Sequence, residues 1–399
     1  MKTLIAAMIF FSATPLMAES LVYEGTEGIG KGKHIVFVAN DHEYRSEQSC
    51  PLMAKILAKH HGFKCTVLFG VDEAGFIKAG AGDVPGLEVL QDADLIFFFT
   101  RFMSLPNDQA QMIVDYFERG GPVVSVRTST HCFNRQQGEW AKLNFDYKGE
   151  DYLGGLGEQV FGNTWNKERG QSHYGSNHVM GCRITPVAGA KDHPILKGID
   201  SIHAYSGAYD APVPKDGNAL LEVQVLNTFG PSDEVNAERP LVNAGYTRDS
   251  YVAPSGEKKN ARVVYTSMGA SEDLLDQGAR RFFVNACLWA ASMESSIQPD
   301  LDVSIVGTYS PSPYTNGAYF YEGVKPLDLA GWDSGVMPQD AKLAGVDSLN
   351  HAAKHRRVLS NRPELKAKLA KTYPELYGPD VKLPETSKNK KKTPAKKAK

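Results

Sequence analysis

HIVFVA at residues 34–39, LIFFFT at residues 95–100 and PVVSV at residues 122–126 decide the fold of this chain. Each is a short run rich in β-branched and aromatic residues, which is typical of a parallel strand buried on both faces of a sheet. A further run of this kind, FKCTVLF, occupies residues 63–69. We therefore predict four buried strands in the first third of the chain.

Helical patterns alternate with these strands. Residues 51–60 carry apolar side chains at helical spacing, and Gly62 follows where a helix-ending glycine is expected. A second helix is expected over residues 106–119, which a pair of glycines ends. Alternating strands and helices predict an α/β fold with a doubly wound, mostly parallel sheet of the flavodoxin-like type.

The same alternation continues along the chain. A strongly amphipathic helix is expected over residues 278–291, where it would close the α/β domain. Further strands are expected at residues 182–187, 219–225, 241–246 and 261–267.

Composition limits the classes of function. The chain has 399 residues, of which 42% are hydrophobic and 23% charged, as in an ordinary folded protein. The formal net charge is -2, so no overall basic field attracts nucleic acid. We expect a small-molecule ligand and no nucleic acid partner.

The first 18 residues have the features of a secretory signal peptide. A lysine at position 2 precedes the apolar run of residues 4–11, and small residues end at Ala18, where we expect cleavage. The alternative is a retained membrane anchor, although the run is short of the ~20 residues that a spanning helix needs. No later stretch is apolar enough to span a bilayer, so we expect a periplasmic or secreted protein.

We expect four segments. After the signal peptide (residues 1–18), an α/β domain covers residues 31–293, and a C-terminal extended segment with short helices covers residues 294–375. Residues 376–399 are expected to be a disordered lysine-rich tail, since residues 388–399 contain seven lysines and no acidic residue. This tail is either a solvated end or an attachment to an anionic wall, lipid or polymer.

Several familiar motifs are missing. The five cysteines contain no Cys-x-x-Cys pair, which argues against a zinc ribbon and a thioredoxin-type site, and their disulfide pairing stays open. There is no Gly-x-Ser-x-Gly elbow, no Gly-x-Gly-x-x-Gly after the first strand and no His-Glu-x-x-His. These absences argue against a serine hydrolase, a dinucleotide-binding enzyme and a zincin protease.

Polar clusters follow two of the predicted strands. In a doubly wound sheet the ligand lies beyond the carboxyl ends of the strands, which here are residues 40–45, 100–104 and 127–134. We expect Glu43 and His131 to act as acid and base, and Arg127 to hold an anion or a developing oxyanion. Expected substrate contacts are His42, Tyr44, Arg45, Thr128 and Tyr174.

Each of these roles has a structural alternative. Arg127 would instead form a buried ion pair, and His131 would be a loop histidine held by the backbone. A third polar cluster, residues 171–178, adds His173 and His178, which together with His131 and Glu43 are residue types that bind a zinc-like divalent metal. The alternative is that His173 and His178 are unrelated surface residues.

Several segments, in this order and spacing, resemble the ThuA-like (trehalose utilisation) family, whose fold is of the class I glutamine amidotransferase type. The resemblance runs from about residue 33 to residue 291. It rests on HEYRSE (42–47), GGPVV (120–124), DHPILKG (192–198), VYTSMG (264–269) and RRFFVNA (280–286).

The resemblance implies a role in carbohydrate utilisation. ThuA-like proteins are associated with disaccharides and with keto forms made by partner sugar oxidoreductases, so it implies a small carbohydrate substrate and such a partner. Amidotransferase relatives carry a nucleophilic cysteine where this chain has Arg127, and Cys132 comes five residues later, so glutaminase chemistry is not expected. Members of the family often have a histidine where this chain has Ala270.

Three functions therefore stay open. The first is an exported isomerase, lyase or hydrolase of a keto-glycoside that uses acid/base or metal-assisted chemistry. The second is a non-catalytic sugar-binding module, which Ala270 favours and in which Trp140, Trp165 and Tyr174 would stack on sugar rings. The third is an envelope-associated protein attached through its lysine tail.

Overall fold

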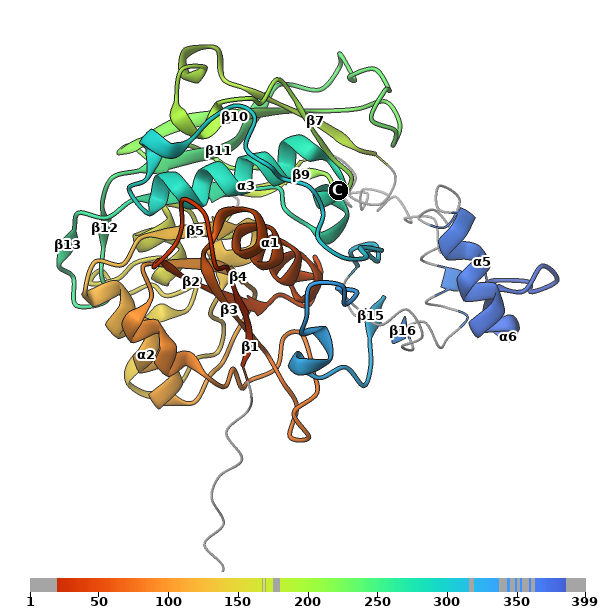
Figure 1. Ribbon diagram of the computed structural model, residues 1–399, viewed down its shortest axis with the longest axis horizontal. Coiled ribbons are helices and arrows are strands. Elements are labelled where there is room, and N and C mark those ends of the chain that lie inside the picture. Colours follow the sequence, from red (N-terminus) through yellow and green to blue (C-terminus); the bar gives the residue numbers. More distant parts are fainter. Residues whose placement is uncertain are drawn as a thin grey trace, which may run out of the picture.

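The structure is a computed structural model that describes residues 20–166, 168, 170–174, 180–315, 319–336, 343–344, 349, 352–353, 359 and 363–384. Ten strands form its main sheet (Figure 1). In their order across the sheet they are β1 (Leu21–Glu24), β3 (Lys64–Phe69), β2 (His34–Asn40), β4 (Leu95–Thr100), β5 (Val123–Val126), β14 (Val263–Thr266), β11 (Val242–Arg248), β10 (Gly217–Val225), β7 (Cys182–Pro186) and β8 (Ile202–Ala204).

The centre of this sheet is parallel. β3, β2, β4, β5 and β14 run in the same direction, and their order across the sheet is the 2-1-3-4-5 order of flavodoxin-like folds. The predicted fold class is therefore confirmed, with each of the four N-terminal apolar runs forming one of these strands.

Antiparallel strands extend the sheet at both ends. β1 pairs with β3 at one edge, and β11, β10, β7 and β8 continue the sheet beyond β14. β1 and β8 lie outside the strands that the sequence predicts. Small two-stranded ribbons are formed by β6 (Ser172–Tyr174) with β9 (Ala208–Asp210), β12 (Tyr251–Val252) with β13 (Lys258–Lys259), and β15 (Phe320–Tyr321) with β16 (Leu343–Ala344).

The helices lie close to the predicted positions. α1 (Ser46–His61), α2 (Asn107–Glu118) and α3 (Gln277–Ala290) belong to the α/β body, and α5 (Pro363–Thr372) and α6 (Pro374–Tyr377) follow near the C-terminus. α1 begins five residues before the predicted start at Pro51, which lies inside the helix. The prediction treated this proline as the first helical residue, although helices also tolerate proline near their start.

Two hydrophobic cores sandwich the sheet. α1 and α3 pack on one face, while α2 packs on the other (Figure 1). Successive side chains of β4 point to opposite faces of the sheet. The ring centre of Phe97 lies 5.5 Å from that of Phe283 of α3, whereas the ring centre of the next residue, Phe98, lies 6.4 Å from that of Phe117 of α2. The continuous apolar runs of the sequence are thus strands covered on both faces.

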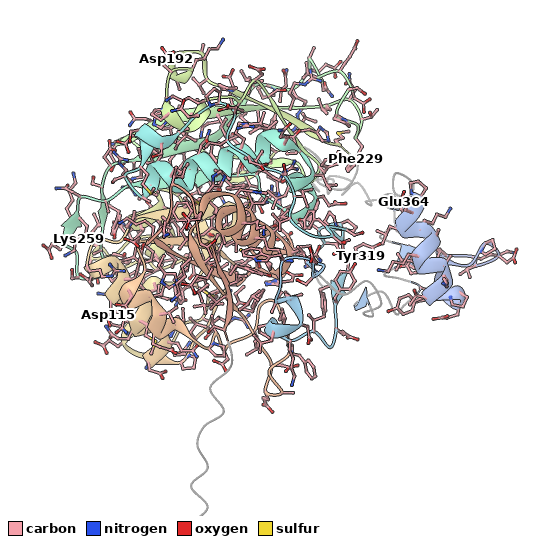
Figure 2. All side chains as sticks on the ribbon, in the orientation of Figure 1. Asp115, Asp192, Phe229, Lys259, Tyr319 and Glu364 are labelled. Carbon is pink, nitrogen blue, oxygen red and sulfur yellow. The ribbon has the colours of Figure 1, made fainter. Side chains whose placement is uncertain are left out.

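The chain after α3 returns to the face that α1 and α3 cover. Val303, Tyr314, Tyr321 and Leu329 of this extension are buried in the same core as α1. Figure 2 shows Tyr319 between the α/β body and α5, which carries Glu364.

The predicted signal peptide and residues 385–399 lie outside the described residues. Within the described part of the chain, every helix is too short or too polar to span a bilayer. All five cysteines are buried thiols, and none of them forms a disulfide with another.

Candidate functional site

Three residues with left-handed backbone follow adjacent parallel strands. They are Arg45 (φ 63°), in the loop after β2, Phe102 (φ 52°), after β4, and Arg127 (φ 47°), directly after β5. Side chains other than glycine adopt this conformation at a cost of about 1–3 kcal/mol, and such strain concentrates at functional sites. The strain lies at the carboxyl edge of the sheet, where a ligand is expected.

Asp41 joins two of the loops that the sequence singled out. It is fully buried at the end of β2, and its carboxylate accepts hydrogen bonds from the backbone N–H groups of Glu43, at 2.8 Å, and Tyr44. It also accepts a hydrogen bond of 2.5 Å from the hydroxyl of Thr128, which follows β5. The two polar loops therefore meet, but Thr128 is buried and bonded to Asp41 instead of facing a substrate.

Arg127 is enclosed by the protein. Its guanidinium donates hydrogen bonds to the backbone oxygens of Ser267, at 2.7 Å, and Gly207, at 3.0 Å, and lies 3.9 Å from the carboxylate of Asp273. Arg127 and Asp273 are both 0% exposed. This geometry favours the structural alternative, a buried ion pair, over direct contact between Arg127 and a substrate.

Two tyrosine rings cover the remaining faces of this guanidinium. Its central carbon lies 3.8 Å from the ring centre of Tyr44 and 4.7 Å from that of Tyr209. Tyr44 is fully buried, its ring lies edge-on to that of Tyr209 with 6.0 Å between ring centres, and burial raises its pKa to about 12. Tyr44, predicted to contact substrate, therefore packs on Arg127 as a neutral phenol.

Arg45 and Tyr174 also have structural partners. Arg45 is buried and donates to the backbone oxygens of His42, at 2.7 Å, and Thr315, at 3.4 Å. The hydroxyl of Tyr174, which is 4% exposed, donates to the backbone oxygen of Pro240. Both side chains hold the backbone around the site, and neither is open to a substrate in this conformation.

His131 is held in one orientation by a chain of hydrogen bonds. Tyr265 donates to the amide oxygen of Gln171, whose amide nitrogen donates to the hydroxyl of Thr130 at 2.5 Å. The hydroxyl oxygen of Thr130 lies 3.2 Å from Nδ1 of His131 and 3.5 Å from the backbone oxygen of Arg127. Nδ1–H of His131 can donate to Thr130 while Thr130 donates to Arg127, and Thr130 can equally donate to Nδ1; a base at Nε2 requires the first of these two tautomers.

That tautomer leaves a lone pair on Nε2 of His131. No described residue hydrogen-bonds this atom, and it is not among the buried polar atoms that lack a partner, so it retains contact with solvent. Burial, followed by the nearby charge of Arg101, lowers the pKa of His131 well below its ordinary value. His131 is therefore a neutral, oriented imidazole, as a general base requires.

Arg101 is the cation that faces this histidine. It follows β4 directly, and its Nε lies 3.0 Å from the carboxylate of Glu43 while its Nη1 donates to Nε2 of His42. Arg101 and Glu43 are partly exposed, with 14% and 16% of their side chains accessible. Burial raises the pKa of Glu43, against the opposing effect of Arg101, as a general acid requires.

His42 supports this pair. Its Nε2 accepts from a guanidinium that never loses its proton, so the ring is neutral with its proton on Nδ1. Burial and the charge of Arg101 lower the pKa of His42, while Asp41 raises it. His42 thus fixes Arg101 against Glu43.

Aromatic rings form the rim around these polar groups. Phe102 is central, because the guanidinium carbon of Arg101 lies 4.2 Å from its ring centre and the ring of His131 lies 5.1 Å away. The ring of Trp165 is partly exposed, and its centre lies 5.2 Å from the ring centre of His131 and 5.2 Å from that of Tyr209. Partly exposed aromatic rings beside oriented polar groups suit a sugar ring, whose C–H faces stack on them.

The described residues do not include all of the predicted metal ligands. His173 is exposed and its ring packs edge-on against Trp165 at 4.8 Å, while His178 lies outside the described residues. The described part of the chain contains no group of three His, Cys, Asp or Glu side chains arranged to hold a metal. The described donors therefore do not fit a zinc-like site, and we derive no step through a metal.

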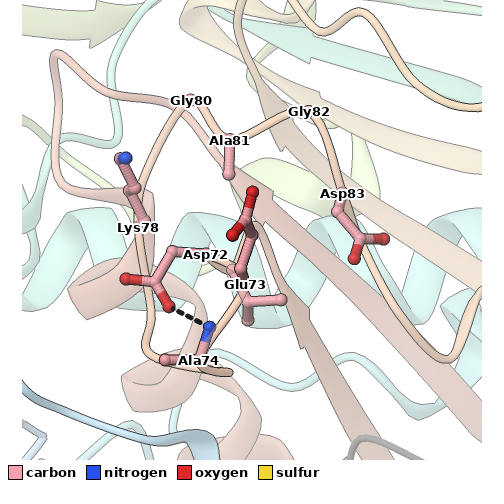
Figure 3. Close-up of a pocket in the computed structure, with 9 residues that line it drawn as sticks. Asp72, Glu73, Ala74, Lys78, Gly80, Ala81, Gly82 and Asp83 are labelled. Atoms are coloured by element: carbon pink, nitrogen blue, oxygen red, sulfur yellow. Dashed lines mark hydrogen bonds between the residues drawn. The ribbon is translucent and has the colours of Figure 1, made fainter. Parts of the chain in front are cut away.

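A hollow of about 690 Å³ lies after β3, at the same edge of the sheet. Figure 3 shows the carboxylates of Asp72, Glu73 and Asp83 around it, together with Lys78. Gly80 connects this hollow to the site, because a Cβ added there would come within 2.9 Å of the ring of His42. A side chain at residue 80 would therefore displace His42.

The sequence places Arg101 and Phe102, within residues 100–104, at the ligand edge but gives them no role, and it does not indicate Tyr209 at all. Arg101 had a usable signal, since it is a charged residue directly after the fully apolar run at 95–100 and shares a sheet edge with residues 41–45. Tyr209 had none, because it reaches the site through the β9 ribbon.

The lowered pKa of His131 gives a prediction for stability. Between pH 6.5 and the lower folded-state pKa, the unfolded chain binds a proton at His131 and the folded chain does not, so this contribution to stability falls as pH falls. We expect the free energy of unfolding of the wild type, minus that of His131→Asn, to decrease from pH 7.5 to pH 5.0, by up to ~1.4 kcal/mol per pH unit. Urea denaturation at several pH values measures it, and a constant difference would contradict the neutral state of His131.

No family model matches this chain, and no curated protein matches it either. Solved structures do match. A protein described as ThuA-like, from Parabacteroides merdae, aligns over 72% of this chain and 96% of its own, with 16% identity and a TM-score of 0.34. The mmIFT52 N-terminal domain aligns over 65% and 98%, with 13% identity and a TM-score of 0.31.

The glutaminase domain of Trypanosoma brucei CTPS with bound acivicin aligns over 68% of this chain and 97% of its own, with 11% identity and a TM-score of 0.33. This domain and the ThuA-like protein are of the two kinds that the sequence resemblance names. At these scores the likenesses carry no argument about activity. The assignment of the fold rests on the strand order of this chain.

Proposed function

We propose that this protein is an acid/base enzyme of carbohydrate utilisation that acts on a keto-disaccharide or related keto-glycoside. The observation that carries the proposal is the position of His131, held by Thr130, next to the ring of Phe102 that also contacts Arg101 of the Arg101–Glu43 pair. The resemblance of the sequence to ThuA-like proteins supports the choice of substrate.

The chemistry follows from the ketone. A carbonyl next to the carbon that carries a C–H bond acidifies that bond, so Nε2 of His131 takes the proton and the electron pair moves toward the carbonyl oxygen. Arg101 stabilises the negative charge that develops on this oxygen. Where the glycosidic bond lies on the carbon beyond the one that lost its proton, the electron pair then expels the leaving oxygen, and Glu43, whose pKa burial raises, is the acid assigned to protonate this oxygen.

Isomerisation, elimination and net hydrolysis share this first proton transfer. In isomerisation the proton returns to a neighbouring atom, and in net hydrolysis water adds to the product of elimination. Proton NMR of the purified protein with a panel of 3-keto-disaccharides distinguishes the three outcomes by their products. Spectra that stay unchanged on every member of the panel would contradict the proposal.

Replacing Arg101 tests the role of the cation. We expect Arg101→Met to lower kcat/KM by about 10²- to 10³-fold, as loss of one oxyanion donor does. The acid limb of the pH profile should also move to higher pH, because a positive charge that lowers the pKa of His131 is gone. Arg119→Met is the matched control, since Arg119 stacks on Tyr116 of α2 away from the site; equal losses in both variants would contradict the assignment.

A non-catalytic sugar-binding module is the second candidate. Ala270, fully buried where ThuA-like proteins often carry a histidine, favours it, as does the enclosure of Arg127. In that case calorimetry would detect sugar binding that Trp165→Ala weakens and His131→Asn leaves unchanged, and no substrate would be turned over.

Export is a further part of the proposal. It is supported by the charged start and apolar run of residues 1–18. A sugar oxidoreductase in the same compartment would supply the ketone. Mass spectrometry of the protein from its native cells should give a chain that begins near residue 19, and an intact Met1 would contradict export by cleavage.

A further inference from the structure

The C-terminal extension delivers a tyrosine to the site. Tyr314 lies outside the α/β domain, yet its ring stacks on Tyr44 with 4.7 Å between ring centres and 17° between their planes. Tyr44 in turn covers the guanidinium of Arg127, and Tyr209 covers another face of it. The result is a stack of Tyr314, Tyr44 and the guanidinium of Arg127, with the ring of Tyr209 edge-on to that of Tyr44.

This segment of the extension is firmly anchored. Gln48 of α1 and Ser312 exchange two hydrogen bonds, from the amide of Gln48 to the hydroxyl at 2.7 Å and from the backbone N–H of Ser312 to the amide oxygen at 2.9 Å. Ser271 donates to the backbone oxygen of Ser312 at 2.8 Å and accepts on its own backbone oxygen from Tyr309 at 2.5 Å. Residues 309–315 therefore hold Tyr314 in place from both α1 and the turn after β14.

The anchors are themselves buried. Gln48, Ser271 and Ser312 are each at most 2% exposed, and Tyr314 is 4% exposed. A loosely held covering segment would leave such polar groups in contact with water, whereas Gln48, Ser271 and Ser312 are hydrogen-bonded within the protein. Tyr314 is thus a fixed part of the fold and does not belong to a segment that moves aside.

We propose that Tyr314 is a specificity-determining residue that closes the inner end of the site and limits the length of sugar it accepts. The inference rests on the proposed function for the identity of the substrate. With Tyr314 in place, a sugar stacks only on the rim formed by Phe102 and Trp165. Without it, the outer face of Tyr44, backed by the charge of Arg127, becomes a further stacking surface for a sugar ring.

The test compares substrates of two lengths in two variants. We expect Tyr314→Ala to raise the ratio of kcat/KM for 3-keto-maltotriose over 3-keto-maltose by about three- to tenfold, the worth of one added ring contact. Tyr314→Phe keeps the stack and should leave this ratio at the wild-type value. An unchanged ratio in a folded Tyr314→Ala protein would overturn the inference.

A second variant and a second measurement separate this inference from the proposed function. Gln48→Ala keeps Tyr314 but removes its anchor, so the ratio should shift in the same direction by a smaller factor. If no keto-sugar is turned over, the proposed function fails. Calorimetry with maltose and maltotriose then still tests whether Tyr314 limits the length of sugar that binds. A higher ratio of affinities for maltotriose over maltose in Tyr314→Ala than in the wild type would then support the role of Tyr314. The same ratio in all variants would overturn it.

Discussion

Replacing His131 with asparagine should lower kcat/KM on a keto-disaccharide by about 10²- to 10⁴-fold, the usual contribution of a positioned general base. Asparagine approximates the size of the imidazole and its amide can still donate to Thr130, so the loss should come from the base itself and not from the fold. Steady-state kinetics and a thermal unfolding curve on the same sample separate the two effects.

The pH profile sharpens this expectation. Since burial and Arg101 lower the pKa of His131, the acid limb of kcat/KM for the wild type should lie below pH 6.5, and His131→Asn should lack it. His193→Asn is the matched control, because burial also lowers the pKa of His193, whose ring packs on Trp289 of α3. A loss of activity in the control equal to that in His131→Asn would contradict the assigned role.

Asp273→Ala should lower the free energy of unfolding by about 3–5 kcal/mol, the cost of breaking a buried ion pair by removing one partner. Asp273 accepts hydrogen bonds from the backbone N–H groups of Ser206, Gly269 and Ala270, at 2.9–3.0 Å, besides balancing the charge of Arg127. Alanine would leave those three N–H groups without an acceptor and the buried charge of Arg127 without its carboxylate. Urea denaturation measures the difference.

A second acidic residue supplies the control for this substitution. Glu294 pairs with Arg262 through two hydrogen bonds of 2.8 Å, but 38% of its side chain is exposed. Exposed pairs contribute about 0–1 kcal/mol, so Glu294→Ala should cost far less than Asp273→Ala. Equal costs would show that the enclosure of the Arg127–Asp273 pair has no special weight in stability.

The parts of the fold that could be predicted are those with local signals. The buried strands at residues 34–39 and 95–100 carry uninterrupted apolar runs, and the helix at 277–290 carries a strong amphipathic pattern, so each was found close to its observed bounds. Because the carboxyl ends of parallel strands lie at the same edge of a sheet, the proximity of residues 41–45 to residues 127–131 could also be predicted.

The roles of the two arginines could not be predicted. Arg127 and Arg101 both follow buried strands of the same sheet, and only long-range contacts distinguish them. Arg127 is covered by Tyr209 and paired with Asp273, which lie 82 and 146 residues further along the chain (209 − 127 and 273 − 127). Arg101 keeps access to solvent and to Glu43.

The extension posed the same difficulty. Residues 309–315 have no strong period, and the bond between Gln48 and Ser312 spans 264 residues. Nothing local to the segment indicates that Tyr314 stacks on Tyr44. The acidic, basic and aromatic residues of the candidate site could thus be predicted from their positions near the strand ends. The contact of Tyr314 with Tyr44 could not, because it joins segments that are far apart in the sequence.

The most direct test of the central claim follows deuterium at the carbon next to the ketone. A 3-keto-disaccharide is incubated in D₂O with the wild type and with His131→Asn, and proton NMR records exchange at that carbon and any change in the anomeric signals. We expect exchange or product formation with the wild type, and a rate at least 10²-fold lower with His131→Asn. Equal rates in the two proteins would contradict the central claim, as would the absence of both exchange and product with the wild type.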